Sequence, residues 1–424
     1  MSPTTQVTTP ADGALLDCRM QKKAVAVSEL RFGMFIAELD RPWAETPFAF
    51  QGFTLINDRQ LEALRKLCRQ VFVDVTRGAA PGSARASTPT VDLTIPGFKI
   101  TGTSTYAETF GVNKEIRRAA GLYLQALSLL HDFVQPLAKG STALDGKAIH
   151  DVAKELAESV LRNPEALLLM GTLRETTVPA HARALQVAIY MMMFGRFLQL
   201  ERDQIHLLGL LGLLQDIGKT RLPAPLLEKQ ELTPEEEEIF KKHVELSAHI
   251  VGVASGLPPK FASLTLLHHE RQDGSGYPRG FKGYQIGLLG SIAAICDAYD
   301  ALVAIPPYGK GFVTSAAVNG LLQGRGTAFH GPLVEQFVRC VGSFPVGTAI
   351  ELCSGETGIV VADNMLQRLK PKVMLLRDPA GGALAAPKLI DLAGDPQKQG
   401  GGSYRLRRAL PQGTLKFDPL ALFS

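Results

Sequence analysis

The chain has 424 residues, 46% hydrophobic and 20% charged, a composition typical of a globular protein of two or three domains. The lysines and arginines behind its net charge of +4 are spread along the chain, which excludes a concentrated nucleic-acid-binding surface. The five cysteines are odd in number and form no CxxC pair, so neither a disulfide framework nor a zinc ribbon is expected. The N-terminus does not resemble a signal peptide, and the longest apolar run, 207–214, is too short for a membrane span; we therefore expect a cytoplasmic protein.

Before residue 106 the sequence predicts one small folded unit between two polar segments. Residues 1–20 have the composition of a flexible leader, and residues 79–105 are rich in Gly, Ala, Pro, Ser and Thr, as a linker is. Between them, short alternating apolar runs and a capped helical pattern predict a small α/β domain at 21–78.

The remainder of the chain is predicted to be mainly helical, with a β-rich part near its end. Apolar periodicity predicts a helical connector at 106–170 and an almost continuously helical domain at 171–335. Alternating apolar residues at 348–376 predict short strands, so we expect a β-rich appendage at 336–396. Residues 397–424 are glycine-rich and then basic, which is typical of a solvated tail.

An apolar helix is predicted around 204–217, with Asp216 in its last turn and Gly218 as its C-cap. This places a carboxylate at the negative end of the helix dipole, which is unfavourable by several tenths of a kcal/mol unless a cation lies nearby. Either Lys219 or a metal ion can supply that cation, and the sequence leaves both open.

His243 belongs to a predicted helical region that starts with a capping box formed by Thr233 and Glu236. It shares one apolar face with Ile239 and Ile250. A lone histidine in such a face is more often a hydrogen-bonded core residue than a metal ligand.

His268 and His269 end another apolar helix and precede the glycine-rich turn 274–278. A hydrogen-bonded pair without a metal is the alternative interpretation. Asp297 lies in an apolar helix at 288–303, where an unpaired buried charge would cost several kcal/mol. Together these inward-facing side chains favour a metal site of nitrogen and oxygen donors, which suits iron, manganese, zinc or nickel.

The order and spacing of these residues resemble the HD-GYP family, bacterial phosphodiesterases that hydrolyse cyclic di-GMP on a helical metal-binding HD fold. The resemblance covers roughly 176–325, and residues 22–75 are similar to a domain of unknown function often found before HD-GYP modules. Residues 345–376 resemble the β-like tail of the same subgroup. The resemblance implies a mainly α protein, with a helical HD-type metal-binding core, a small N-terminal α/β unit and a small C-terminal β appendage. The matching segments are Asp216 to Lys219, His243, His268 to Glu270, Asp273 to Gly280 and Asp297 to Leu302.

The resemblance also implies roles for individual residues and a cofactor. Asp216 and Lys219 would be catalytic, and the cofactor would be one divalent transition metal, iron or manganese first, or none. The implied metal ligands are Asp216, His243, His268, His269 and Asp297. In the family, a segment after the last aspartate holds the substrate phosphates, and this sequence retains Tyr308 and Lys310 of it. The loop of Gly276, Tyr277 and Pro278 would contact diguanylate cyclase (GGDEF) proteins, unless it is kept for its turn geometry alone.

Two family histidines are missing from this sequence. Gln215 stands at the position of the HD histidine, and Arg183 at that of a histidine on the preceding helix, while His181 lies two residues earlier. We therefore expect a degenerate site in which Arg183 neutralises Asp297 or Asp216. Losing one ion of a two-metal mechanism removes several kcal/mol of stabilisation and hence orders of magnitude in rate.

Three functions remain open on this sequence. The first is a degenerate HD-GYP protein, weak or inactive as a phosphodiesterase, that binds cyclic di-GMP, a GGDEF protein or a second copy of itself. The second is an active metal-dependent cyclic di-GMP phosphodiesterase that uses one metal or recruits His181. The third is a helical scaffold without a metal.

Overall fold

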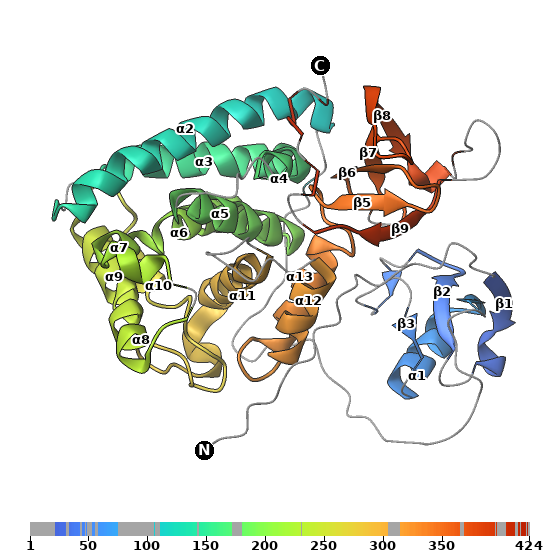
Figure 1. Cartoon of the computed structure of the whole chain (residues 1–424). Helices are drawn as coiled ribbons and strands as arrows, with labels where there is room; N and C mark the ends of the chain where they lie inside the picture. Colours follow the sequence, from blue (N-terminus) through green and yellow to red (C-terminus); the bar gives the residue numbers. More distant parts are fainter. Residues whose placement is uncertain are drawn as a thin grey trace.

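The computed structural model of the chain is shown in Figure 1. The predicted leader 1–20, the predicted linker 79–105, Tyr308 and Lys310 lie outside the residues that it describes, and of His181 it describes the backbone alone. The described residues are 22–30, 34–42, 45–46, 48, 53–55, 58–74, 106, 111–141, 144–171, 180–229, 231–303, 314–364, 369–394, 396, 404–411, 414–415, 417–420 and 422.

The N-terminal unit is a four-stranded antiparallel sheet with one α-helix, as the sequence predicted. The strands run in the order β1-β4-β2-β3. Leu61 and Leu64 of the helix pack with Ile36 and Val71 of the sheet in one small core. The elements are β1 (Lys22–Ala26), η1 (Val27–Glu29), β2 (Phe35–Leu39), β3 (Phe53–Thr54), α1 (Asp58–Leu67) and β4 (Gln70–Asp74).

The middle of the chain is helical, which confirms the predicted fold class. In Figure 1, α2 and α3 lie side by side along one edge, with α5 and α6 next to them and α7 to α10 at one end. The elements are α2 (Val112–Ala138), α3 (Gly146–Arg162), α4 (Pro164–Gly171), α5 (Ala180–Phe197), α6 (Arg202–Leu214), η3 (Ile217–Arg221), α7 (Ala224–Leu227), α8 (Pro234–Lys241), α9 (His243–Val253), α10 (Phe261–Thr265), η4 (Gly283–Ile286), α11 (Gly287–Val303), α12 (Thr314–Gln323) and α13 (Gly331–Val341).

Three aromatic side chains join α5, α11 and α13 in the centre of the helical core. Phe337 meets both Phe194 and Tyr299 edge to face, with ring centroids 5.1 Å apart in each pair. Such pairs stabilise by about 0.5–1.5 kcal/mol beyond the area that they bury. The two helices that carry Arg183 and Asp297 are therefore held in a fixed relation.

The segment Gly283–Val303 is, among the described residues, the one long and apolar enough to cross a membrane. About two thirds of its apolar window, 67%, is buried inside the protein. It also carries Asp297 and Asp300, which are both buried. These properties are those of a helix of the core.

Two helices end earlier than the sequence suggested. The helix α6 ends at Leu214, and Asp216 precedes the 3-10 helix η3, which contains Gly218. The predicted C-cap role of Gly218 is therefore wrong. A Cβ at Gly218 would lie 2.1 Å from the carbonyl oxygen of His243, so glycine is needed because η3 approaches α9 closely.

The second early end is that of α10 at Thr265, which leaves His268 and His269 in the turn after the helix. The predicted buried position of Ile239 is also wrong, because its side chain is 42% exposed. The helical region breaks at Lys242, between α8 and α9, so Ile239 does not share the face of His243.

A five-stranded antiparallel sheet forms the predicted β-rich appendage, in the order β8-β7-β6-β5-β9. Ile359 and Met374 on one face join the helical core, and Ile350 and Val373 on the other face belong to a separate core. Cys353, just after β5, is disulfide-bonded, whereas Cys68, Cys296 and Cys340 are thiols, so the cysteines form no disulfide framework among the described residues. The strands are β5 (Ala349–Leu352), β6 (Thr357–Ala362), β7 (Lys372–Arg377), β8 (Ala383–Asp391) and β9 (Leu406–Ala409), with η5 (Leu392–Gly394) after β8.

Strand β9 lies in the segment that the sequence suggested was a solvated tail, and that interpretation is wrong for residues 406–409. Arg407 and Arg408 each form an ion pair with Glu351 of β5, at 2.5 and 2.7 Å. The strand is too short, and too basic, for its alternation to be visible in the sequence.

Replacing Gly218 by alanine should lower the free energy of unfolding by about 1–3 kcal/mol, because the added methyl group meets the backbone of α9. Urea denaturation followed by circular dichroism measures this change. The control is Gly121→Ala in α2, where a Cβ meets nothing within 4 Å and alanine is the better helix former. Equal free energies of unfolding in the two variants would contradict the close approach.

Candidate metal centre

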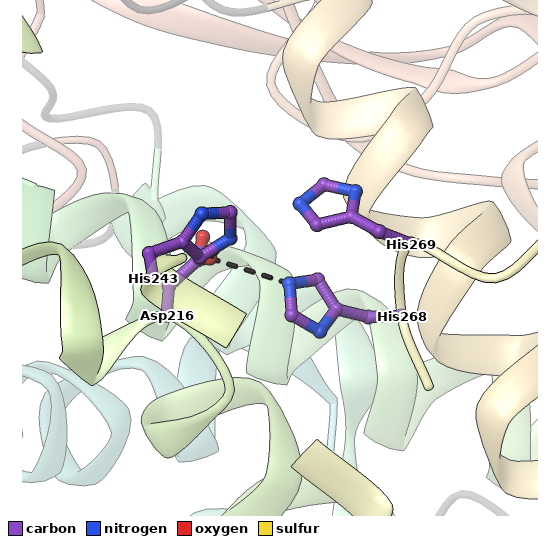
Figure 2. A group of neighbouring side chains, drawn as sticks. All are labelled: Asp216, His243, His268 and His269. Carbon is purple, nitrogen blue, oxygen red and sulfur yellow. Dashed lines mark ion pairs between the residues drawn. The ribbon is translucent and has the colours of Figure 1, made fainter. Parts of the chain in front are cut away.

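Four side chains meet where η3, α9 and the turn after α10 come together (Figure 2). One potential ligand atom of each lies within 4.8 Å of the others. Asp216 Oδ1 is 3.3 Å from Nε2 of His243 and 3.4 Å from Nε2 of His268. The group consists of Asp216, His243, His268 and His269, which are four of the five metal ligands predicted from the sequence.

Backbone carbonyl groups fix the orientation of two of these imidazoles. Nδ1 of His243 lies 2.6 Å from the carbonyl oxygen of Phe240, and Nδ1 of His268 lies 3.0 Å from that of Thr265. A carbonyl oxygen only accepts, so each Nδ1 carries the proton and donates it. The lone pair of each Nε2 then points into the cluster, which is the usual arrangement of a metal-binding histidine.

The atoms that face one another in this cluster lack hydrogen-bond partners among the described residues. They are Asp216 Oδ1 and the Nε2 atoms of His243, His268 and His269, all of which are buried. Lone pairs that face a carboxylate oxygen repel it unless a cation lies between them. This donor set therefore fits a divalent metal ion with a preference for nitrogen and oxygen ligands.

The protonation states in the cluster also suit metal binding. Burial lowers the pKa of His243 and holds the pKa of His269 well below its ordinary value, so both imidazoles are neutral at pH 7. Burial alone would raise the pKa of Asp216, but the nearby Lys219 ammonium keeps that pKa well below the usual range. Nζ of Lys219 lies 2.6 Å from Asp216 Oδ2, which leaves Oδ1 facing the histidines.

Asp297, the fifth predicted ligand, belongs to a different group of charges. Nη2 of Arg183 donates to Asp297 Oδ1 at 2.9 Å, and Nε of Arg183 donates to Asp300 Oδ2 at 2.9 Å. The sequence hypothesis paired Arg183 with Asp297 or Asp216, and the structure pairs it with Asp297 and also with Asp300. Burial alone would lower the pKa of Arg183, but the two carboxylates raise it, so the guanidinium stays charged.

Asp300 was missed by the sequence analysis as a member of the site. Its side chain is fully buried in α11, three residues after Asp297. Two carboxylates at this spacing lie on one face of a helix, so a cation between them could have been expected from the sequence.

Gln215, at the position of the missing histidine, is 1% exposed. Neither its amide oxygen nor its amide nitrogen has a hydrogen-bond partner within the described part of the chain. A buried amide without partners costs about 1–3 kcal/mol. Such a cost is typical of a functional position and unusual in an ordinary core.

The glycine-rich loop after the two histidines is held by one buried carboxylate. Glu270 is 1% exposed and accepts hydrogen bonds from the backbone N–H groups of Arg279 and Phe281, both at 2.8 Å. Tyr277, in the loop, stacks on His269 with ring centroids 4.7 Å apart. The loop is thereby joined to the metal-binding side chains, and Glu270 is a second residue whose role the sequence analysis missed.

A helical core with an aspartate and three histidines converging at helix ends defines a protein of the HD-domain class. The chain matches the HD domain family over residues 168–332 and a domain of unknown function (DUF3391) over residues 22–143. The second match starts in the N-terminal sheet, spans the predicted linker and ends after α2. The chain belongs to the HD-GYP family, as the sequence resemblance implied.

Known relatives place the chain in this family over most of its length. It is 31% identical over 375 residues to the cyclic di-GMP phosphodiesterase PA4108 of Pseudomonas aeruginosa, which covers 87% of this chain and 89% of that protein. It is 38% identical over 128 residues to a cyclic di-GMP phosphodiesterase of Thermotoga maritima, covering 30% of this chain and 35% of that protein. A similar solved structure is Bd1817, a HDG"Y"P protein from Bdellovibrio bacteriovorus, with 17% identity, a TM-score of 0.46, and coverage of 75% of this chain and 98% of that one.

Replacing His268 by alanine removes one of the four donors and should weaken Mn²⁺ binding by more than about tenfold. Elemental analysis and titration of chelator-treated protein measure this. The matched control is His249→Ala, because His249 is exposed on α9, the helix that begins with His243. The donor assignment is wrong if the two variants hold equal amounts of metal.

Metal-free protein should lose stability as the pH falls below about 6.5. The lowered pKa values of His243 and His269 mean that the unfolded chain binds more protons than the folded chain below that pH. The free energy of unfolding therefore decreases on acidification, by up to about 1.4 kcal/mol per pH unit for each histidine.

Urea denaturation at pH 7.5 and pH 5.5 in the presence of a chelator measures this difference. It should shrink in His269→Asn and stay unchanged in His249→Asn, where the histidine is exposed. The same free energy of unfolding at both pH values in the unmodified protein would disprove the lowered pKa values of His243 and His269.

Proposed function

We propose that this chain is a degenerate HD-GYP protein that acts in cyclic di-GMP signalling by binding a ligand or a partner. In this proposal it is weak or inactive as a phosphodiesterase. The names of its relatives, which are cyclic di-GMP phosphodiesterases, support cyclic di-GMP as the ligand. The observation that carries the loss of activity is the ion pair of Arg183 with Asp297.

Arg183 bears on how many ions the site can hold. A guanidinium cannot be a metal ligand, and it stays charged in this environment. It engages Asp297 and Asp300 and so supplies the positive charge that a second ion would otherwise bring to these carboxylates. We therefore expect one divalent transition metal, iron or manganese, at the cluster of Asp216 and the three histidines.

The charge balance of the site favours an anionic ligand. Lys219 balances Asp216, and burial lowers the pKa of His243 and of His269, so these two imidazoles are neutral at pH 7. A bound divalent ion would therefore leave the cluster with excess positive charge, and it would act as a Lewis acid toward a phosphodiester oxygen. Lys219, with only 12% of its side chain exposed, is positioned to donate a hydrogen bond to the same anion.

An active phosphodiesterase is the alternative, and the identity of 31% over 89% of the Pseudomonas aeruginosa protein favours it. The proposed catalytic residues Asp216 and Lys219 are both present and in contact. Recruitment of His181 as a replacement ligand belongs to this alternative; its side chain lies outside the described residues.

Partners and location are part of the same proposal. A GGDEF protein would meet the loop of Gly276, Tyr277 and Pro278, which is half-buried against His269. A second copy of the chain is another proposed partner, and nucleic acid is not one. A cytoplasmic location is proposed, in keeping with a cyclic dinucleotide ligand.

The test is to restore the two missing histidines in Arg183→His/Gln215→His. The unmodified protein should hold about one ion per chain, and the double variant two. Cyclic di-GMP turnover should then rise by about a hundredfold or more, since a second ion stabilises the attacking and leaving oxygens together.

Elemental analysis and turnover are measured on the same samples. The matched control is Arg202→His, because Arg202 is exposed on α6, with 60% of its side chain accessible. Two ions with efficient turnover in the unmodified protein would overturn the proposal in favour of the active enzyme.

A further inference from the structure

Arg271 starts the loop after the histidine pair, and its guanidinium is held at one end. Nη1 donates to the carbonyl oxygen of His268 at 3.2 Å and to that of Glu270 at 3.0 Å. Its Cζ lies 5.2 Å from the centroid of the Phe329 ring, a cation–π contact. The side chain is therefore fixed in direction, although it is long and charged.

The other edge of this guanidinium has no protein partner. Within the described ranges, Nε and Nη2 of Arg271 donate no hydrogen bond, and no carboxylate lies within ion-pair distance. Neither of these two nitrogens is fully buried, so both are accessible to solvent. Arg183 and Lys219 differ in this respect, because each is engaged by a carboxylate of the site.

Arg271 is anchored next to the metal centre. Its anchor is the backbone of His268, whose imidazole belongs to the cluster. Burial lowers the pKa of Arg271, but an arginine keeps its charge at pH 7.

A fixed, partly buried guanidinium with two parallel free donors matches the geometry of a phosphate group. We infer that Arg271 is a phosphate-binding residue of this site, with Nε and Nη2 donating to two oxygens of one phosphoryl group of the ligand. The inference rests on the proposed function, since it takes a cyclic dinucleotide as the ligand. The sequence analysis assigned phosphate binding to Tyr308 and Lys310 alone, and Arg271 would be a further residue with this role.

The test compares Arg271→Met, Arg271→Lys and Arg279→Met in the full chain loaded with Mn²⁺. Arg279 is the matched control, because it is exposed in the same loop and its guanidinium lies 5.8 Å from the Phe281 ring. Isothermal titration with cyclic di-GMP should give a Kd about 10- to 100-fold higher for Arg271→Met. Arg271→Lys should lie between, and Arg279→Met should stay within about twofold.

Two further measurements separate phosphate binding from a structural role. Metal content and Tm should match the unmodified protein in all three variants. The dependence of Kd on salt concentration should be weaker in Arg271→Met than in Arg279→Met, because an ionic contact has been lost.

The outcomes distinguish this inference from the proposal on which it rests. Unmodified protein that binds cyclic di-GMP, together with an unchanged Kd in Arg271→Met, would overturn the role of Arg271 alone. A weakened variant that has also lost its metal would assign Arg271 a structural role and overturn the inference too. Absence of binding to the unmodified, metal-loaded protein would overturn the ligand assignment and this inference with it.

Discussion

The position of the Asp216 carboxylate is the constraint on which the candidate site depends. Its Oδ2 is bound by Lys219, while its Oδ1 faces imidazole nitrogens that have no hydrogen to donate. This arrangement requires η3 to lie directly on α9, and glycine at 218 permits that approach. The contact between these two short segments, rather than any one helix, brings ligands from distant parts of the sequence together.

A second constraint comes from the carboxylates of α11. Asp297 and Asp300 are buried in an apolar helix, where ionised groups persist only with a counter-charge. Arg183 provides that charge through hydrogen bonds to both residues. A metal ion and a guanidinium can both neutralise carboxylates, but only the metal accepts further ligands. The site therefore has two parts. The cluster of Asp216 and the three histidines suits a metal ion, whereas the carboxylates of α11 are already neutralised by Arg183.

Much of the fold and of the site was predictable from the sequence, and the reasons for the misses are local. Periodicity identified the helical core. Ionisable side chains at apolar helical positions, together with the resemblance to a known family, identified Asp216, His243, His268 and His269. Helix boundaries failed at Gly218 and Thr265, because tertiary packing and short 3-10 turns ended those helices early. Asp300 was missed although its spacing from Asp297 places both carboxylates on one face of a helix. Glu270 and Arg271 were missed because their partners are backbone groups, which no spacing rule reveals.

Glu270 fixes the shape of the glycine-rich loop from within the loop itself. Its buried carboxylate is satisfied by two backbone N–H groups of the same loop, without any ion. The loop beside the histidines therefore holds its shape through its own hydrogen bonds, so little conformational entropy would remain to oppose the binding of any ligand there. It also follows that ligand side chains elsewhere in the site can be exchanged during evolution while the loop keeps its form.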